Sequence, residues 1–508
     1  MTKTAMDPQS AVEKVRSFLD SHAAGWITEK DAMLFFDEQC PVRDVCVAIS
    51  QLSDESALEA MLKFLENVVA HERVAEQLVV PEMREFMIAA CHSPSERLRN
   101  VVVSAVSNVR NPNLPAEIDI GLIMALMRDE ETGIALRASK LVLRWLGTTL
   151  KTESAKAALT NRLLAEYKIK RAELNETEEF RFISLFIEIA RLDNQLFKLI
   201  ESETLLSPIV DQFLSSSSDL LVKLGSLTLI ESLSEFSDGQ MFLADSNILL
   251  TLDQELTGPL ADSTTVISVL LSMARIMPFV DHTDQIRRVL LSPSGEVPKV
   301  LSHFITSSSN AERMCAMKVY AAISAGADKS EPIATFLRQS WRALGEIVFA
   351  LSDVDVEVIN TALDALHTIV KKWERNPFME SFESQNRLIQ STLDTLRRHP
   401  FPECRCLVYA LLGAIVLCGD LSDSGLALIL SEPSPIRAAM LNFQSESNYD
   451  SRVAKCDFVR IIVKMEDKNI LKRFFKKDEV ENLIDYAEKG LEYVPVTSAK
   501  DEMETEAL

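Results

Sequence analysis

Glycine is scarce in this sequence, which contains 14 glycines and a modest 18 prolines among 508 residues. Folds built of β-strands need many tight turns, and glycine supplies the positive φ angles that such turns often require. No segment shows the sustained alternation of apolar and polar residues that is typical of a half-buried strand. A hydrophobic content of 47% still allows a large core. These features favour an all-α fold.

Positive charge is also in short supply, because 53 Lys and Arg face 75 Asp and Glu, a formal net charge of −22. Binding to nucleic acid or to anionic lipid depends on cationic side chains that displace counterions. We therefore expect no nucleic acid and no membrane among the partners, and a basic protein surface instead. The one dense cationic cluster is interpreted as a solvated helix face; it comprises Lys472, Arg473, Lys476 and Lys477.

Long hydrophobic runs are missing, and the N-terminal residues MTKTAMDPQS contain no apolar signal segment. The longest uncharged run, between Arg405 and Asp420, has 14 residues and is too short to span a membrane. We interpret it as a buried helix. The eight cysteines are scattered among aliphatic residues, which is typical of reduced thiols in an intracellular protein. The expected location is the cytoplasm, with the nucleus as a second compartment.

Motifs that carry chemistry are lacking as well. None of the glycines completes a phosphate-binding loop or a nucleophile elbow. No two histidines have metal-ligand spacing, and Cys404 and Cys406 are too close together for a zinc knuckle. Paired carboxylates such as Glu178 and Glu179 stand where a helix would begin, and negative charge stabilises that end. We therefore expect no enzymatic activity, no cofactor and no metal.

What the sequence does contain is an internal repeat. Polar turns that lead into amphipathic helices recur 36 to 48 residues apart, close to the period of HEAT and armadillo repeats. The spacing predicts a curved solenoid of about ten helix pairs with a single continuous core over residues 10–496. Residues 1–9, the stretch 376–386 and the acidic tail 497–508 are expected to be loose or disordered. The predicted turns begin near Asp54, Ser95, Glu131, Glu176, Asp219, Ser263, Asn310, Asp355, Pro402 and Asp450.

The helix that follows Asp355 illustrates the pattern. Its apolar residues, from Val358 to Trp373, recur at helical spacing, and Asp353 or Asp355 can cap its first turn. A shorter helix precedes each turn, often with a proline in its first turn, where the missing N–H costs nothing. A single helix pair cannot cover its apolar face, but stacked neighbours can.

The polar face of each second helix is the expected binding surface, because one helix row lines the concave side of a solenoid. Aromatic residues are enriched at interfaces, which makes Tyr320 the strongest candidate contact. The candidate partner-binding residues are Arg181, Glu188, Arg313, Tyr320, Asn360, Asp364 and Lys371.

Three segments resemble one known family. Residues 399–406 read HPFPECRC ahead of a long apolar helix, and residues 493–497 read YVPVT just before a short acidic end. Residues 219–252, which include LVK at 221–223 and GQMFL at 239–243, form the third segment. All three resemble the 26S proteasome non-ATPase regulatory subunit 5 family. Length, repeat layout and tail extend the resemblance over most of the chain, and the first 200 residues match as a pattern only.

The resemblance implies a HEAT/armadillo-like chaperone of regulatory-particle assembly. Such a protein binds the C-terminal domain of one AAA ATPase subunit of the proteasome base, within an intermediate that contains other base subunits. It hinders early docking to the core particle and leaves before maturation. We expect a monomer before binding. The alternative is a HEAT-type scaffold or transport adaptor for a basic partner, and a hydrolase in a helical fold is a third class.

Overall fold

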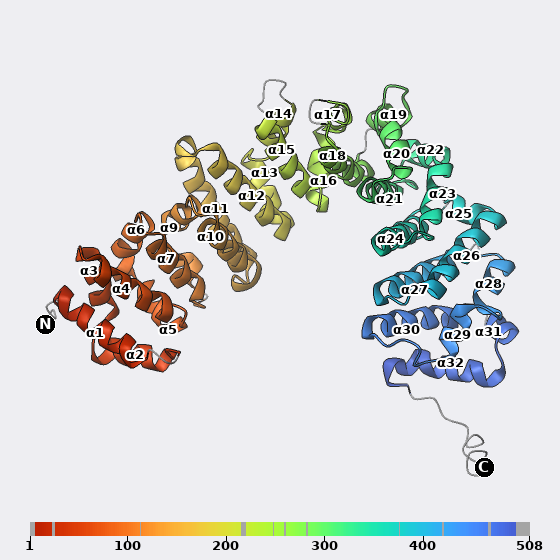
Figure 1. Cartoon of the computed structure of the whole chain (residues 1–508). Coiled ribbons are helices and arrows are strands. Elements are labelled where there is room, and N and C mark those ends of the chain that lie inside the picture. Colours follow the sequence, from red (N-terminus) through yellow and green to blue (C-terminus); the bar gives the residue numbers. More distant parts are fainter. Residues whose placement is uncertain are drawn as a thin grey trace, which may run out of the picture. The chain divides into compact units, whose positions relative to one another are not determined.

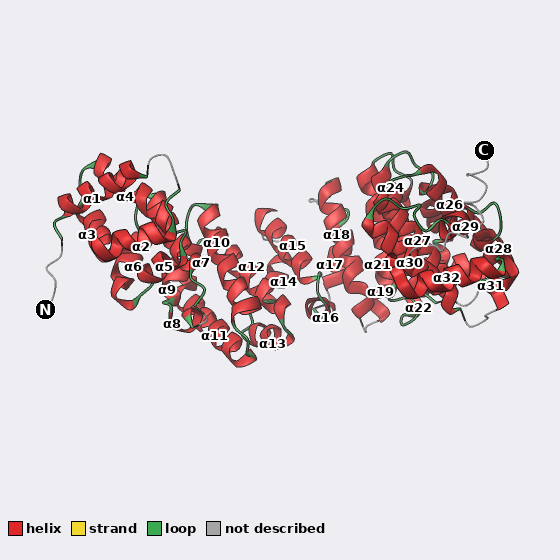
Figure 2. Ribbon diagram, turned by 90° about the horizontal axis from the view of Figure 1, so that it is seen from below, coloured by secondary structure: helices red, strands yellow, loops and turns green. Residues whose placement is uncertain are grey.

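The computed structural model describes residues 6–22, 26–111, 113–214, 220–246, 248–258, 261–280, 283–374, 376–418, 421–465 and 469–493. These residues form helices joined by short loops, and no strand occurs among them (Figure 2). They divide into two compact units, Met1–Ile209 and Val210–Leu508. The prediction of an all-α repeat fold is confirmed. The curvature and the single core predicted for the whole array remain predictions.

Unit 1 (Met1–Ile209) contains thirteen α-helices and three short helical turns, and α14 (Ser207–Leu214) extends across the division. The elements are α1 (Pro8–Ser21), α2 (Glu29–Glu38), α3 (Val42–Gln51), α4 (Glu55–Val68), α5 (Glu72–Leu78), η1 (Pro81–Met83), α6 (Arg84–Cys91), α7 (Glu96–Asn108), α8 (Leu114–Glu117), α9 (Ile120–Met127), α10 (Thr132–Arg144), η2 (Trp145–Thr149), α11 (Glu153–Lys170), η3 (Arg171–Glu173), α12 (Glu176–Leu192) and α13 (Asn194–Ser202).

Unit 2 (Val210–Leu508) continues the same arrangement. Its elements are α15 (Leu220–Leu233), α16 (Ser237–Asp245), α17 (Ile248–Glu255), α18 (Ser263–Ile276), η4 (Met277–Phe279), α19 (Thr283–Leu291), α20 (Val297–Ile305), α21 (Asn310–Ser324), α22 (Glu331–Gln339), α23 (Trp341–Ala350), α24 (Val356–Lys372), α25 (Pro377–Glu380), α26 (Phe382–Arg398), α27 (Pro402–Leu417), α28 (Asp423–Leu430), α29 (Pro435–Leu441), α30 (Tyr449–Lys464), α31 (Asn469–Phe474), α32 (Lys477–Lys489) and η5 (Gly490–Glu492).

The predicted repeat is confirmed at its turns. Every predicted turn that falls on a described residue lies within one residue of a helix start, and Asp219 lies outside the described residues. Asp54, Ser95 and Asp355, for example, are the N-cap residues of α4, α7 and α24. Each accepts a hydrogen bond from a backbone N–H of the first turn that would otherwise lack a partner. Polar residues of this kind therefore set the repeat length.

In each unit the helices that follow these turns pack side by side, and we call them the second-helix row. In unit 2 the row includes α18, α21, α24, α27 and α30, and in unit 1 it includes α4, α7, α10 and α12 (Figure 1). The helices that precede the turns form the first-helix row. It includes α3, α6, α9 and α11 in unit 1, and α20, α23, α26 and α29 in unit 2.

The core lies between the two rows of each unit. The predicted apolar stripe of α24 is buried from Val358 to Trp373, and α12 buries Ile183, Phe186 and Ile187. Each fully buried aliphatic or aromatic side chain of this size contributes about 1.5–3 kcal/mol to folding. Stripes on successive helices therefore hold the array together, as the repeat period predicts.

One ion pair recurs between successive repeats, and we call it the arginine staple. An arginine four residues after the N-cap of a second helix binds an acid two residues before the next N-cap. A single carboxylate thereby ties the turn of one repeat to the helix of the previous one. The three staples are Arg99 Nε–Asp129 Oδ2 at 2.8 Å, Arg313 Nη2–Asp353 Oδ2 at 2.8 Å and Arg405 Nε–Glu446 Oε2 at 2.6 Å.

Two predicted loose segments need correction. The stretch 376–386 contains α25 and the start of α26, and the Asn376 side chain is fully buried and caps α25. Its prolines and polar residues are helix starts and caps, which a composition of Pro, Ser and Asn also produces. At the N-terminus, α1 already begins at Pro8, inside the predicted disordered segment 1–9. Residues 1–5 and the tail 497–508 lie outside the described residues.

Candidate interaction surfaces

Three of the predicted contact residues lie on one face of α24 in unit 2. Asn360, Asp364 and Lys371 are spaced by four and seven residues, and Asp364 and Lys371 are exposed. Asn360 is half-buried, and its Oδ1 atom has no hydrogen-bond partner in the part of the chain that the structure describes. His367 lies on the same face. Burial lowers its pKa, Lys371 lowers it further and Asp364 opposes this, so the imidazole is neutral at pH 7.

Helix α27 borders this face with apolar residues. The hydrogen bond from Cys418 Sγ to the Val370 carbonyl oxygen, at 3.2 Å, shows that the C-terminal ends of α24 and α27 meet. The uncharged run on α27 is mostly buried as predicted, yet Ala410 is exposed and Leu417 is 70% exposed. The second-helix row of unit 2 therefore offers charges of both signs beside an apolar edge, a combination that suits protein recognition.

Tyr320 corrects the sequence prediction. The residue is 1% exposed, and its ring stacks on Phe336 with centroids 6.0 Å apart. Burial raises the pKa of its hydroxyl to about 12. Tyr320 is therefore a core residue and cannot meet a partner. Large aromatic side chains occur in cores and at interfaces alike, so residue type alone could not separate the two.

The two predicted arginines have internal partners. Arg313 belongs to the second arginine staple and also donates a hydrogen bond to Asn310 Oδ1 at 2.8 Å. Arg181 donates from Nη1 to the Asp129 carbonyl oxygen at 2.7 Å, and so joins α12 to the turn before α10. Both side chains are half-buried, and both hold repeats together. Helical spacing correctly predicted that both arginines lie off the apolar stripe. It did not show that their guanidinium groups bind other residues of this chain.

Glu188 is the accessible candidate of unit 1. It lies on the polar face of α12, is half-exposed, and its carboxylate stands 4.0 Å from the Arg191 guanidinium in an i, i+3 pair. Such surface pairs contribute little to stability. The Glu188 carboxylate can therefore leave Arg191 and bind a partner with little loss of free energy.

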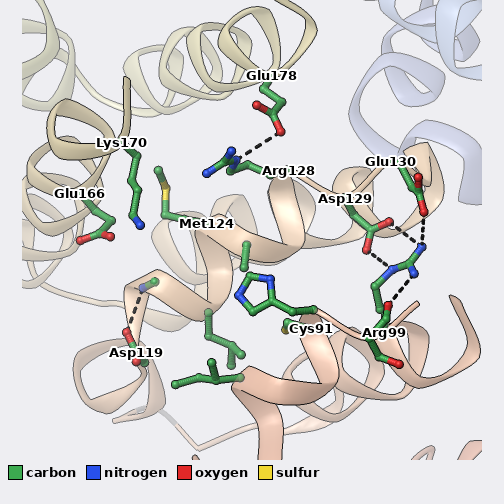
Figure 3. Close-up of a pocket in the computed structure, with 16 residues that line it drawn as sticks. Cys91, Arg99, Asp119, Met124, Arg128, Asp129, Glu130, Glu166, Lys170 and Glu178 are labelled. Atoms are coloured by element: carbon green, nitrogen blue, oxygen red, sulfur yellow. Dashed lines mark hydrogen bonds and ion pairs between the residues drawn. The ribbon is translucent and has the colours of Figure 1, made fainter. Parts of the chain in front are cut away.

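Unit 1 also contains a hollow of about 550 Å³ that the sequence did not indicate. Residues of α6, α9 and α11 line it, and charged side chains converge at its rim (Figure 3). Arg128 Nε donates to Glu178 Oε1 at 3.2 Å, beside the buried Arg99–Asp129 staple. Because the linings come from three repeats, only the folded chain brings them together. The pairs Arg99–Asp129 and Arg128–Glu178 join residues 30 and 50 positions apart, and the sequence alone does not show that they meet.

The chemistry of this hollow does not favour a nucleophile. Cys91 lines it, but burial, together with the Asp129 carboxylate, raises the pKa of its thiol to about 12. Reactive cysteines need the opposite shift, towards the thiolate. Among the described residues, no three His, Cys, Asp or Glu side chains are grouped to hold a metal ion. In that same part of the chain, no helix has the length and hydropathy that a membrane crossing requires.

Comparisons with known proteins were made on sequence and on structure. A family model described as "Proteasome non-ATPase 26S subunit" matches residues 36–502. The comparison with curated proteins gives no match.

Solved helical proteins are similar in fold only. The crystal structure of an engineered protein has a TM-score of 0.43 and 16% identity, over 81% of this chain and 96% of that chain. Kap121p bound to Pho4p has a TM-score of 0.40 and 11% identity, over 98% of this chain and 54% of that chain. The chain thus spans about half the length of the Kap121p chains that it matches. Similarity at this level carries no information on function.

Proposed function

This chain belongs to the proteasome non-ATPase 26S subunit family, and we propose that it is an assembly chaperone of the regulatory-particle base. In this proposal it binds the C-terminal domain of one AAA ATPase subunit, within an intermediate that contains other base subunits. While bound, it hinders docking of the base to the core particle. It acts by occupying a surface, without catalysis and without a nucleotide or metal of its own.

The observation that carries the proposal is the family match over residues 36–502. Within that span lies the HPFPECRC segment, through which the chain resembles the non-ATPase regulatory subunit 5 family. A role as a chaperone also requires a surface that can be released. The α24 face, which contains Asn360, Asp364 and Lys371, provides exposed charges beside a short apolar edge on α27. Interfaces of this kind exchange more readily than large hydrophobic ones.

The net charge of −22 supports a basic partner surface. Long-range attraction would speed the encounter and make it sensitive to salt. A small number of side chains should contribute most of the affinity, and the rest should exclude water. On the α24 face we assign these roles to Asp364 and Lys371, with the exposed Leu417 of α27 as the apolar contact.

The test is a binding titration of the purified chain with the isolated C-terminal domain of each base ATPase subunit in turn. Native mass spectrometry of each mixture gives the stoichiometry. We expect a one-to-one complex with one domain, and loss of that complex when intact core particle competes for the same subunit. If no ATPase domain binds, and a basic cargo protein or phosphatase subunit binds instead, the chain is a scaffold or adaptor and the proposal is wrong.

A further inference from the structure

The first-helix row of unit 1 contains two adjoining hollows of about 550 and 570 Å³. Ile88, Asp119, Gly121, Leu122 and Glu166 line both of them, so the two form one groove across α6, α9 and α11. We call it the α6–α11 groove. It lies on the first-helix row of unit 1, whereas the face used in the proposed function lies on the second-helix row of unit 2.

The walls of the groove expose large apolar side chains. Val80 precedes η1, Ile88 lies on α6 and Ile169 lies on α11; all three are exposed and line the second hollow. Ile169 is the most exposed of the three, at 72%. Large apolar residues that gather in one depression mark a site for a partner more often than scattered ones do.

The arginine side chains that line the groove already bind acceptors within this chain. Arg84 Nε donates to Asp119 Oδ2 at 2.9 Å, and Arg128 Nε donates to Glu178 Oε1 at 3.2 Å. Arg162 directs its guanidinium at the carbonyl oxygens of the α8 segment, 2.6 Å from that of Ile118. These contacts leave the guanidinium groups little capacity to attract an acidic ligand.

Two carboxylates of the groove remain available for a ligand. Glu117 and Glu166 line the second hollow, and neither has an ion-pair or hydrogen-bond partner among the residues that the structure describes. Of the two other arginine and lysine side chains in the lining, Arg99 belongs to the first arginine staple, and Lys170 Nζ stands 4.0 Å from Glu173 Oε2. The groove therefore combines apolar walls with available negative charge.

We propose that the α6–α11 groove is a second docking site, which takes a basic amphipathic helix of another protein. Apolar residues at i, i+3, i+4 and i+7 of the guest would contact Val80, Ile88 and Ile169. Lysine or arginine on its flanks would pair with Glu117 and Glu166. Neighbouring helices lie 8–10 Å apart, so the groove is about 20 Å long from α6 to α11. That length corresponds to a helix of about 13 residues.

The experiment uses the full chain and a fluorescein-labelled amphipathic peptide of about 14 residues, with leucines at helical spacing and lysines elsewhere. A second peptide replaces every lysine by glutamate. Fluorescence anisotropy should show binding of the lysine peptide that weakens with salt, and no binding of the glutamate peptide. Equal binding of both peptides, or of neither, would overturn the proposal.

Variants locate the site. Ile169→Glu, and Glu117→Lys combined with Glu166→Lys, should each weaken the lysine peptide about tenfold. Ile169 and Glu117 are exposed and Glu166 is half-buried, and circular dichroism verifies the fold of each variant. The matched controls are Leu136→Glu, on the exposed face of α10, and Glu201→Lys on α13; neither should change the affinity.

If Glu166→Gln and Ile169→Glu leave the affinity unchanged in folded protein, the groove is not the site. These outcomes are independent of ATPase binding on the α24 face.

Discussion

The first turns of the second helices and the exposed positions further along their polar faces differ in how their charged residues are paired. In the first turns, Arg99, Arg313 and Arg405 bind acids of the following repeat, and the carboxylate of Glu446 is 2% exposed. Asp364, in the middle of α24, and Lys371, in its last turn, are exposed to solvent. Both sets of residues are polar and lie off the apolar stripe, so the sequence pattern does not distinguish them.

The difference teaches which polar residues hold the array together and which remain available. An arginine staple pairs a charge that would otherwise be buried without a partner. Removal of the staple therefore lowers the free energy of unfolding. An exposed charge without a buried partner stabilises the fold little and can be used for recognition. Stability and binding should consequently separate along a single helix, and the predictions below test that separation.

The largest effect is expected for Glu446→Ala. Its carboxylate accepts bonds from Arg405 and, at 2.6 Å, from the Tyr409 hydroxyl, so its removal leaves the buried Tyr409 hydroxyl and the half-buried Arg405 guanidinium without their carboxylate acceptor. We expect a loss of about 3–5 kcal/mol in the free energy of unfolding, measured by urea denaturation. Glu346→Ala, at an exposed position of α23, is the control and should change stability by less than about 0.5 kcal/mol. Equal urea midpoints for the two variants would contradict the structural role of the staple.

A smaller effect, with a defined pH dependence, is expected for Asp353→Asn. Hydrogen bonds from the Asp355 backbone and from Arg313 hold the pKa of the Asp353 carboxyl below its ordinary value of 3.8, against the effect of burial. Its stabilising contribution is therefore complete above pH 3.8 and is lost as the pH falls through the folded-state pKa.

We expect the variant to be less stable than the natural chain by about 1–3 kcal/mol at pH 7. The difference should shrink as the pH falls from 4 towards 2. Chemical denaturation at several pH values measures it. A difference that stays constant or grows in acid would contradict the ion pair.

Tyr320→Phe should have a still smaller effect. The change keeps the ring that stacks on Phe336 and removes a buried hydroxyl near Ser340. We expect a loss of about 0.5–1.5 kcal/mol in stability and an unchanged affinity for any partner. A folded variant with weakened binding would restore Tyr320 as a contact residue.

Much of the fold could be predicted from the sequence, because its determinants are local. N-cap residues such as Asp54 and Asp355 directly precede the helices that they cap. The apolar stripe of α24 can be identified from the spacing of its residues alone. The stretch 376–386 was misread because Pro377 and its neighbours resemble a loop in composition, whereas Asn376 and Ser381 are caps of short successive helices.

The site was less predictable, because pairing across repeats depends on contacts between distant residues. Periodicity placed Arg313 and Asp364 alike off the core, but only the fold brings Asp353 to Arg313 and leaves Asp364 exposed. The α6–α11 groove could not be found from the sequence, since Ile88 and Ile169 meet only after α6, α9 and α11 stack. The staple could have been sought, because its arginine and acid hold fixed positions relative to successive N-caps.

The central claim, that the α24 face binds an ATPase subunit, is tested most directly by a charge exchange. Asp364→Lys with Lys371→Glu keeps the net charge, and so does the control exchange of Arg342→Glu with Glu346→Lys on exposed positions of α23. Both should leave stability within about 0.5 kcal/mol. Isothermal titration with the bound C-terminal domain should show about a tenfold weaker Kd, about 1.4 kcal/mol, for the α24 exchange alone. Unchanged affinity, or equal weakening by both exchanges, would contradict the account.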